Sequence, residues 1–106
     1  MLLDRTVFRM YVKAGCPFCD KAVDKIRNEL SSTLHTVDIT NEPEVHQRII
    51  EETGHRTVPA IWLGDEFIGG CDDLLNLCDS DSFTVKVLRE EIKILRNEVI
   101  RLRRSI

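Results

Sequence analysis

The chain has 106 residues, of which 42% are hydrophobic and 31% charged, and its formal net charge is −3. This length and apolar content suit one domain with one core, and no segment has the roughly 18 unbroken apolar residues of a membrane span. Eight basic and fifteen acidic residues lie in 1–81, against seven and three in 82–106. We therefore expect no membrane partner, and nucleic acid is not an expected partner either. The basic tail indicates either a solvated helix face or a segment that binds something acidic.

Asp4 and Arg5 interrupt the first apolar run, so the N-terminus does not resemble a signal peptide, and we expect a cytoplasmic protein in a reducing compartment. The four cysteines are Cys16, Cys19, Cys71 and Cys78. In such a compartment, a C-x-x-C pair beside an alternating strand and helix pattern indicates redox chemistry. A zinc site would need a second tight pair, which this spacing does not supply, so we expect no metal.

The predicted elements begin with a strand over residues 6–12, which are rich in β-branched and aromatic types. A helix follows, because apolar residues recur at three- and four-residue steps at Ala22, Val23, Ile26 and Leu30. A second strand is predicted over 34–39. Asn41 then caps a helix, since Glu44 three residues later completes a capping-box pattern, and Gly54 ends it.

A third strand is predicted over 58–63, and a tight turn leads into a short fourth strand over 66–68. Two glycines break that strand before a helix over about 71–78, and a long helical pattern fills 83–106. The order is β-α-β-α-β-β-α-α. This order predicts an α/β fold with a four-stranded mixed sheet flanked by helices.

Cys16 is expected to be the reactive cysteine, because it lies at the N-cap where strand gives way to helix. An ordinary thiol has a pKa of about 8.5 and is mostly neutral at pH 7. At the N-cap, the free N–H groups of Phe18 and Cys19 can point at the sulfur, and the helix dipole favours negative charge. Pro17 suits the first helical position, and Lys13 adds a positive charge. These effects favour the thiolate of Cys16.

Cys19 lies three residues further on, on the same helical face, which is close enough for a disulfide. Cys16 would attack a substrate disulfide, and Cys19 would resolve the mixed intermediate by exchange. Both cysteines could instead be ordinary buried helix residues, although a strand–Gly–Cys–Pro junction is an odd place for such residues.

Three motifs in register resemble the dithiol glutaredoxins: Lys-Ala-Gly-Cys-Pro-Phe-Cys at 13–19, Arg-Thr-Val-Pro at 56–59 and Gly-Gly-Cys-Asp-Asp-Leu at 69–74. The resemblance covers about residues 5–90. It implies a thioredoxin-like fold with a glutaredoxin core over 1–82. Residues 83–106 would be the last helix, starting on the domain and extending as a tail.

The resemblance also implies glutathione as co-substrate. Pro59 would be a cis proline facing Cys16, and Val58 before it would pair its backbone with the cysteinyl unit of glutathione. Phe18 replaces the tyrosine that many relatives have, and little loss of activity is expected. The implied glutathione-binding residues are Lys13, Phe18, Arg56, Thr57, Val58, Pro59, Gly70, Cys71, Asp72 and Asp73.

The charges of glutathione suit particular residues of that set. Lys13 and Arg56 can bind the glycine carboxylate. The N–H groups of Cys71 and Asp72 at the helix start can bind the γ-glutamyl carboxylate, and Asp72 or Asp73 can accept from the ligand ammonium. The same two acids could equally be ordinary helix-start residues that oppose the dipole.

We expect other roles for the three histidines and for Cys71 and Cys78. His46 lies near a position where some relatives contact glutathione, but we leave it out of the site. His35 and His55 are expected on the surface. Cys71 is a candidate for glutathionylation or oxidation, whereas Cys78 lies in an apolar stretch and is expected in the core.

The C-terminal segment carries a heptad pattern, with apolar residues at Val85, Leu88, Ile92, Leu95, Val99, Leu102 and Ile106. Valine and isoleucine at position a with leucine at d favour a parallel two-stranded coiled coil. Glu91 and Glu98 would then face Arg96 and Arg103 of a second copy. A homodimer through this helix is one interpretation.

The alternative is that the same stripe packs back onto the sheet, since Val87, Ile94 and Ile100 lie off the seam and widen the apolar face. Three heptads are also short, and no polar residue at position a fixes the register.

The leading functional hypothesis is a glutaredoxin that reduces protein disulfides and glutathione mixed disulfides through its Cys-Pro-Phe-Cys pair. Its partners would be glutathione and disulfide-containing or glutathionylated proteins. One alternative is a thioredoxin-type reductant served by a reductase protein. A second is a carrier that holds an iron–sulfur cluster between two subunits through Cys16 and glutathione.

Overall fold

The computed structural model describes residues 5–104, and the predicted order of elements is confirmed. The strands are β1 (Phe8–Val12), β2 (Leu34–Asp38), β3 (Ala60–Leu63) and β4 (Glu66–Gly69). The helices are α1 (Pro17–Asp24), its π-helical continuation η1 (Lys25–Glu29), α2 (Pro43–Thr53), α3 (Cys71–Cys78) and α4 (Asp81–Arg104). Within the described range, no helix combines the length and the apolarity that crossing a membrane requires.

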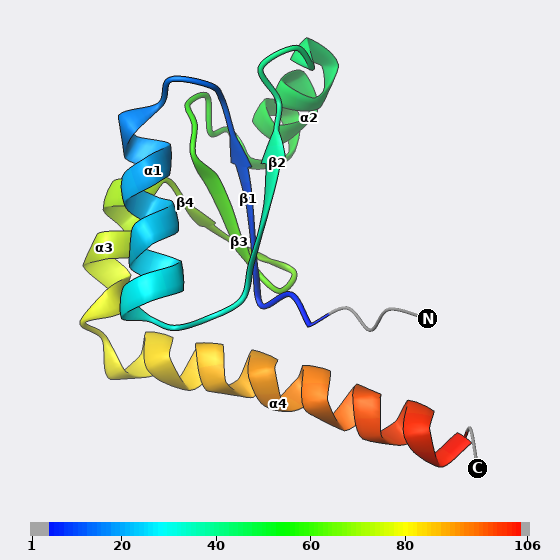
Figure 1. Cartoon of the computed structure of the whole chain (residues 1–106). Helices are drawn as coiled ribbons and strands as arrows, with labels where there is room; N and C mark the ends of the chain where they lie inside the picture. Colours follow the sequence, from blue (N-terminus) through cyan, green and yellow to red (C-terminus); the bar gives the residue numbers. More distant parts are fainter. Residues whose placement is uncertain (1–4, 105–106) are drawn as a thin grey trace.

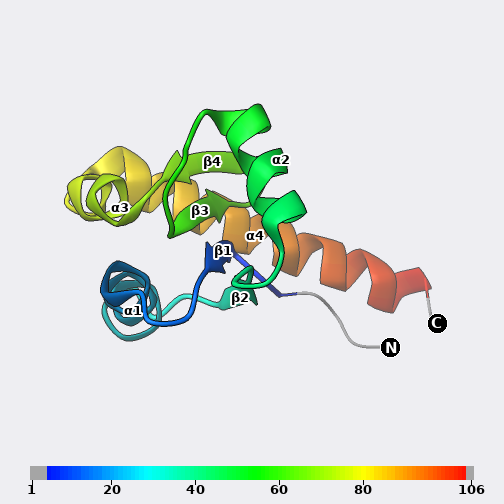
Figure 2. The ribbon, with the colours of Figure 1, turned by 90° about the horizontal axis from the view of Figure 1, so that it is seen from above.

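The four strands form one mixed sheet, as predicted, and their order in the sheet is β2-β1-β3-β4. β1 runs parallel to β2 and antiparallel to β3, and β3 pairs antiparallel with β4. Helices α1 and α3 lie on one face and α2 on the other, while α4 passes along the end of the sheet away from the start of α1 (Figures 1 and 2). This is the thioredoxin-like arrangement that the sequence motifs imply.

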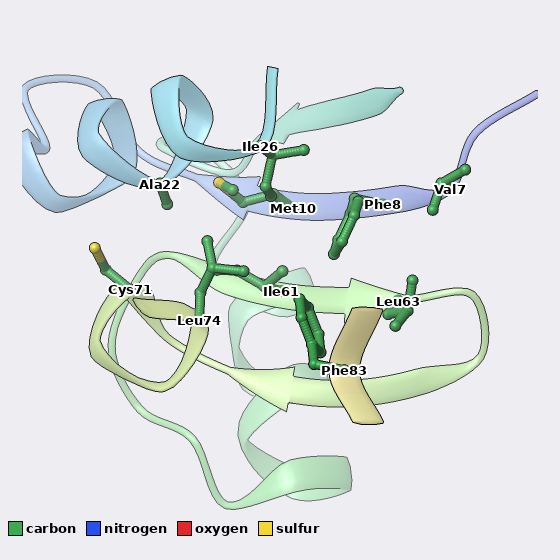
Figure 3. Packing of buried hydrophobic residues seen from close by; sticks show 10 residues of the cluster. All are labelled: Val7, Phe8, Met10, Ala22, Ile26, Ile61, Leu63, Cys71, Leu74 and Phe83. Carbon is green, nitrogen blue, oxygen red and sulfur yellow. The ribbon is translucent and has the colours of Figure 1, made fainter. Parts of the chain in front are cut away.

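Apolar side chains of the central strands point alternately to the two faces of the sheet and form two hydrophobic cores. Phe8 and Met10 of β1 and Ile61 of β3 face α1 and α3, where they are fully buried with Leu74 (Figure 3). On the other face Trp62 of β3 packs in a smaller cluster beneath α2. Side chains of a strand point alternately to the two faces, so a strand covered on both sides is apolar throughout.

The helix α2 begins one residue later than the capping pattern predicts. Its N-cap is Glu42, which makes no side-chain capping hydrogen bond, and Pro43 is the first helical residue. Capping by Asn41 was therefore wrong. Proline disfavours helical backbone at the residue before it, so Glu42 cannot be the first helical residue. The predicted end is confirmed, because Gly54 lies in the left-handed region with φ 76°.

The last helix begins at Asp81, and only one side of it packs on the domain. Phe83 is buried, with its ring centroid 6.2 Å from that of Phe8. Val87 and Ile94, about one and three turns further on, pack against the same core. The residues of the heptad seam instead remain on the surface at Val85, Leu88, Ile92, Leu95, Val99 and Leu102. Ile106 of that seam lies outside the described residues.

Phe83 should therefore anchor α4 to the domain. We expect Phe83→Ala to lower the free energy of unfolding by about 3–5 kcal/mol, because it opens a cavity against Phe8. Urea denaturation at one protein concentration measures this effect. Ile100→Ala is the control, since Ile100 is 41% exposed and its truncation should change stability by no more than about 0.5 kcal/mol. Equal effects of the two substitutions would contradict the anchoring role.

Candidate active site

Cys16 is the N-cap of α1, as predicted. Its backbone is extended, and Pro17 occupies the first helical turn. The N–H of Cys19 donates to the Cys16 sulfur at 3.2 Å. The carbonyl of Cys16 meanwhile accepts from the N–H of Asp20 at 3.2 Å. The sulfur therefore lies at the positive end of the helix dipole, where a thiolate is favoured.

The two cysteines of the motif are joined by a disulfide, with their Cα atoms 5.2 Å apart. They differ in exposure, because Cys16 is half-buried whereas Cys19 is only 3% exposed. A substrate can therefore reach Cys16 but not Cys19. This asymmetry fits the predicted division between an attacking and a resolving cysteine.

The loop that precedes β3 lies against Cys16. The peptide bond between Val58 and Pro59 is cis, as the family resemblance implies. The carbonyl oxygen of Val58 is 3.8 Å from the Cys16 sulfur. The backbone of Val58 is therefore beside the reactive atom, in a position to pair with an extended peptide that brings its own sulfur to Cys16.

The start of α3 forms another side of the candidate site. Gly70 is its N-cap, and the N–H of Gly70 donates to the Asp73 carboxylate at 2.9 Å. Asp73 thus caps its own helix and fills the space that a Cβ on Gly69 would need. Asp72 is exposed and takes part in no hydrogen bond or ion pair with residues 5–104. Of the two acids, Asp72 is the better candidate for the ligand ammonium.

The other predicted ligand residues come from three segments: Phe18 lies on α1, Lys13 follows β1, and Arg56 and Thr57 precede the cis peptide bond. Phe18 has a 58% exposed ring next to the disulfide. Arg56 and Thr57 are exposed, and Lys13 is half-buried. Neither the Lys13 ammonium nor the Arg56 guanidinium forms an ion pair with another residue of 5–104. Their contact with a ligand remains a prediction.

Cys71 and Cys78 are free cysteines that pack in the interior. Cys71 is 4% exposed and points into the layer between α3 and α1 (Figure 3). Burial raises the pKa of the Cys71 thiol, although the charge of Lys21 opposes this, and burial likewise raises the pKa of Cys78. Oxidants act on accessible thiolates, so the structure argues against the expected glutathionylation of Cys71.

Two histidines, His46 and His55, contact backbone carbonyls of the loop before β3. Neither contact was expected from the sequence. The ring of His46 on α2 lies with Nε2 3.0 Å from the carbonyl oxygen of Arg56. His55 is half-buried rather than on the surface, with Nε2 3.1 Å from the carbonyl oxygen of Pro59. Only the position of His55 next to the Arg-Thr-Val-Pro motif could have drawn attention to it. His35 is exposed, as expected.

A cavity of about 570 Å³ lies elsewhere, between α4 and the sheet, lined by residues such as Arg9, Asp65 and Lys93. It contains none of the predicted site residues. No three histidine, cysteine or acidic side chains of residues 5–104 gather as a metal site. The N-cap position of Cys16 and its disulfide with Cys19 are the observations that support disulfide exchange at this site.

Sequence comparison relates the chain to glutaredoxins. The family model named Glutaredoxin matches residues 8–68. Glutaredoxin-C6 of Oryza sativa subsp. japonica is 38% identical over 71 residues, which are 64% of this chain and 62% of the relative. Glutaredoxin-1 of Gallus gallus is 37% identical, over 61% of this chain and 66% of the relative. The chain thus matches somewhat less than two thirds of the length of these two relatives.

Comparison with solved structures also finds glutaredoxins similar to this chain. Wheat glutaredoxin superposes with a TM-score of 0.72 at 27% identity, covering 81% of this chain and 85% of the other. The buckwheat glutaredoxin–glutathione complex superposes with a TM-score of 0.72 at 23% identity, over 79% and 78% of the two chains. At that identity the second likeness shows the fold alone.

Proposed function

The chain belongs to the glutaredoxin family, and we propose that it is a glutathione-dependent thiol–disulfide oxidoreductase that reduces protein disulfides and glutathione mixed disulfides. One observation carries the proposal. The half-buried Cys16 sulfur lies at a helix N-terminus and 3.8 Å from the carbonyl of a residue that precedes a cis proline. A nucleophilic sulfur and an extended backbone for peptide pairing thus share one site.

With a glutathionylated protein, the Cys16 thiolate attacks the glutathione sulfur. The Cys16–glutathione disulfide forms, and the substrate disulfide breaks to release a protein thiol. A second glutathione thiolate attacks the bound glutathione sulfur, which returns Cys16 as a thiolate and releases glutathione disulfide. One free glutathione is consumed in each cycle, because the other half of the glutathione disulfide is the glutathione unit removed from the substrate.

With a protein disulfide, Cys16 forms a mixed disulfide with one substrate sulfur. The Cys19 thiolate then attacks the Cys16 sulfur, so the substrate leaves as a dithiol and the Cys16–Cys19 disulfide forms. The structure holds this disulfide form. Two glutathione molecules reduce the pair and leave as glutathione disulfide.

We place glutathione between the Val58 backbone and the start of α3. Val58 would pair with the cysteinyl unit, and Lys13 and Arg56 would meet the glycine carboxylate. The free N–H groups of Cys71 and Asp72 would bind the γ-glutamyl carboxylate, and the Asp72 side chain the ammonium. The absence of other ion-pair partners for these charges within residues 5–104 supports this placement.

A coupled assay with glutathione, glutathione reductase and NADPH on a glutathionylated peptide tests the activity. We expect turnover that saturates in the peptide. No turnover with glutathione, together with turnover when a thioredoxin reductase replaces the glutathione system, would favour the thioredoxin-type alternative. Visible absorbance in protein purified without oxygen would favour an iron–sulfur carrier. A reducing compartment such as the cytoplasm belongs to the same proposal, because turnover needs reduced glutathione.

We also propose that two copies associate through the outer side of α4. Six apolar side chains with heptad spacing lie there, each 44–57% exposed. Ordinary surface helices turn such residues inward. The domain does not need this stripe, because Phe83, Val87 and Ile94 make the contact with the core. The tail therefore has one side for the domain and another for a partner.

Charge complementarity selects a second copy in parallel orientation. On α4, Glu91 and Glu98 flank one edge of the stripe and Arg96 and Arg103 the other. In a parallel pair each glutamate faces an arginine, whereas an antiparallel pair would place like charges together. Within its own chain, Glu98 also pairs with Arg5, and Glu91 accepts a hydrogen bond from the Ser32 hydroxyl at 3.4 Å.

Light scattering coupled to size exclusion measures the association. We expect a mass of twice the 12.2 kDa of one chain. A mass of 12.2 kDa throughout the range of about 10–200 μM, which spans the weak affinities of short coiled coils, would exclude the dimer.

A further inference from the structure

His55 lies where α2 passes into the loop before β3. It follows Gly54, which ends the helix, and its own N–H donates to the Thr53 hydroxyl at 3.0 Å. The ring edge meets the Phe67 ring, with the centroids 5.5 Å apart. Phe67 in turn packs on Trp62 of the second core, at 4.7 Å. The imidazole therefore has little freedom to move.

The hydrogen bonds of His55 fix its protonated nitrogen. Its Nε2 is 3.1 Å from the Pro59 carbonyl oxygen and 3.3 Å from the Thr57 hydroxyl oxygen. A carbonyl oxygen can only accept, so a hydrogen bond between His55 and Pro59 requires the tautomer with the hydrogen on Nε2. His55 thus donates to the backbone of the residue that follows Val58.

The same ring lies against the start of α3. A Cβ built on Gly70 would lie 3.2 Å from His55 Cε1 and 3.4 Å from the Pro59 carbonyl oxygen. The His55 ring and the Pro59 carbonyl thus border the space that a side chain at Gly70 would need. His55 joins the loop beside Cys16 to the N-terminus of α3, the two backbone segments between which we place glutathione.

We infer that His55 is a positioning residue for glutathione, an assignment that rests on the proposed function. It reaches neither Cys16 nor the ligand. By donating to Pro59 and filling the space below Gly70, it sets the orientation of the Val58 backbone and its spacing from α3. When the N–H donor of His55 is lost, the backbone around Val58 becomes more mobile. The substrate must then order this backbone when it binds. Affinity falls while the chemistry at the Cys16 sulfur is unchanged.

Three substitutions separate the effect of losing the N–H donor of His55 from the effect of losing its ring. His55→Gln carries an amide N–H near the position of Nε2, whereas His55→Asn carries it near Nδ1, out of reach of Pro59. His55→Phe keeps the ring and removes the donor. In the coupled assay, we expect His55→Asn and His55→Phe to raise KM for the glutathionylated peptide about fivefold, with kcat within about twofold. His55→Gln should restore KM to within about twofold of the wild type.

His35→Asn is the matched control, because His35 is an exposed histidine on β2, and its KM should equal that of the wild type. Equal KM values in all His55 variants, or a loss of kcat that follows a fall in thermal stability, would overturn the positioning role. Wild-type turnover separately tests the proposed function; without it, the positioning role falls too.

A long-range ¹H–¹⁵N NMR spectrum tests the hydrogen bond without any activity measurement. We expect the Nε2–H tautomer for His55. A bare Nε2 would show that the Thr57 hydroxyl donates to it, and would overturn the contact with Pro59 from which the inference starts.

Discussion

Replacing Cys16 by serine should lower turnover of a glutathionylated peptide by at least about 10³-fold, to the background of the assay. Cys16 is the one cysteine of the pair that a substrate can reach, since Cys19 is 3% exposed. A serine hydroxyl at the same N-cap would still receive the N–H of Cys19, but it does not ionise near neutral pH and cannot form a disulfide.

Cys19→Ser should behave differently on the two kinds of substrate. Glutathione can resolve the Cys16–glutathione disulfide, so turnover of the glutathionylated peptide should stay within about threefold of the wild type. Reduction of a protein disulfide should fall by more than about tenfold, because no neighbouring thiol releases the mixed disulfide on Cys16. Both rates come from the coupled assay.

Cys78→Ser is the control for the loss of a thiol. Cys78 is partly buried against the core, and burial raises the pKa of its thiol. Its replacement should leave both activities unchanged. Activity in Cys16→Ser, or equal losses in all three variants, would contradict the assignment of Cys16 as the nucleophile.

Charged residues in the exposed stripe of α4 should dissociate the proposed dimer. We expect Ile92→Glu with Leu95→Glu to reduce the mass in solution from twice 12.2 kDa to 12.2 kDa. The two side chains are 55% and 56% exposed, so the monomer loses no core packing. Two carboxylates buried in the seam, by contrast, would have no counter-charge.

Ile100→Glu is the matched control. Ile100 is on the same helix and 41% exposed, but it lies off the seam, so this variant should remain a dimer. Turnover per chain should be unchanged in both, because α4 runs along the end of the sheet away from the start of α1 (Figure 1). A dimer in the double variant would show that another surface mediates association.

Leu102→Cys tests the orientation. In a parallel pair, residue 102 of one copy faces residue 102 of the other, so mild oxidation should link two chains. In an antiparallel pair the two residues lie at opposite ends and no link forms. Dimers that do not cross-link would contradict the parallel arrangement.

The sequence predicted the local structure around Cys16 correctly. The N-cap position of Cys16 follows from adjacent residues, since Pro17 favours the first helical turn and the helix supplies its own free N–H groups. The order of elements followed for the same reason, because strand and helix periodicities are properties of short segments. One local pattern failed: Asn41 matched a capping box, but Pro43 is the first helical residue and the cap is Glu42, one residue later.

Other features depend on which segments the fold brings together. No spacing in the sequence could place the His55 ring between Pro59 and Gly70, assign Asp73 to the cap of its own helix, or bury Cys71. The heptad pattern predicted the apolar stripe on α4. Only the tertiary structure decided that Ile94 contacts the core while Leu95 remains exposed. Periodicity establishes that two sides of a helix are apolar, but the fold determines which side the domain covers.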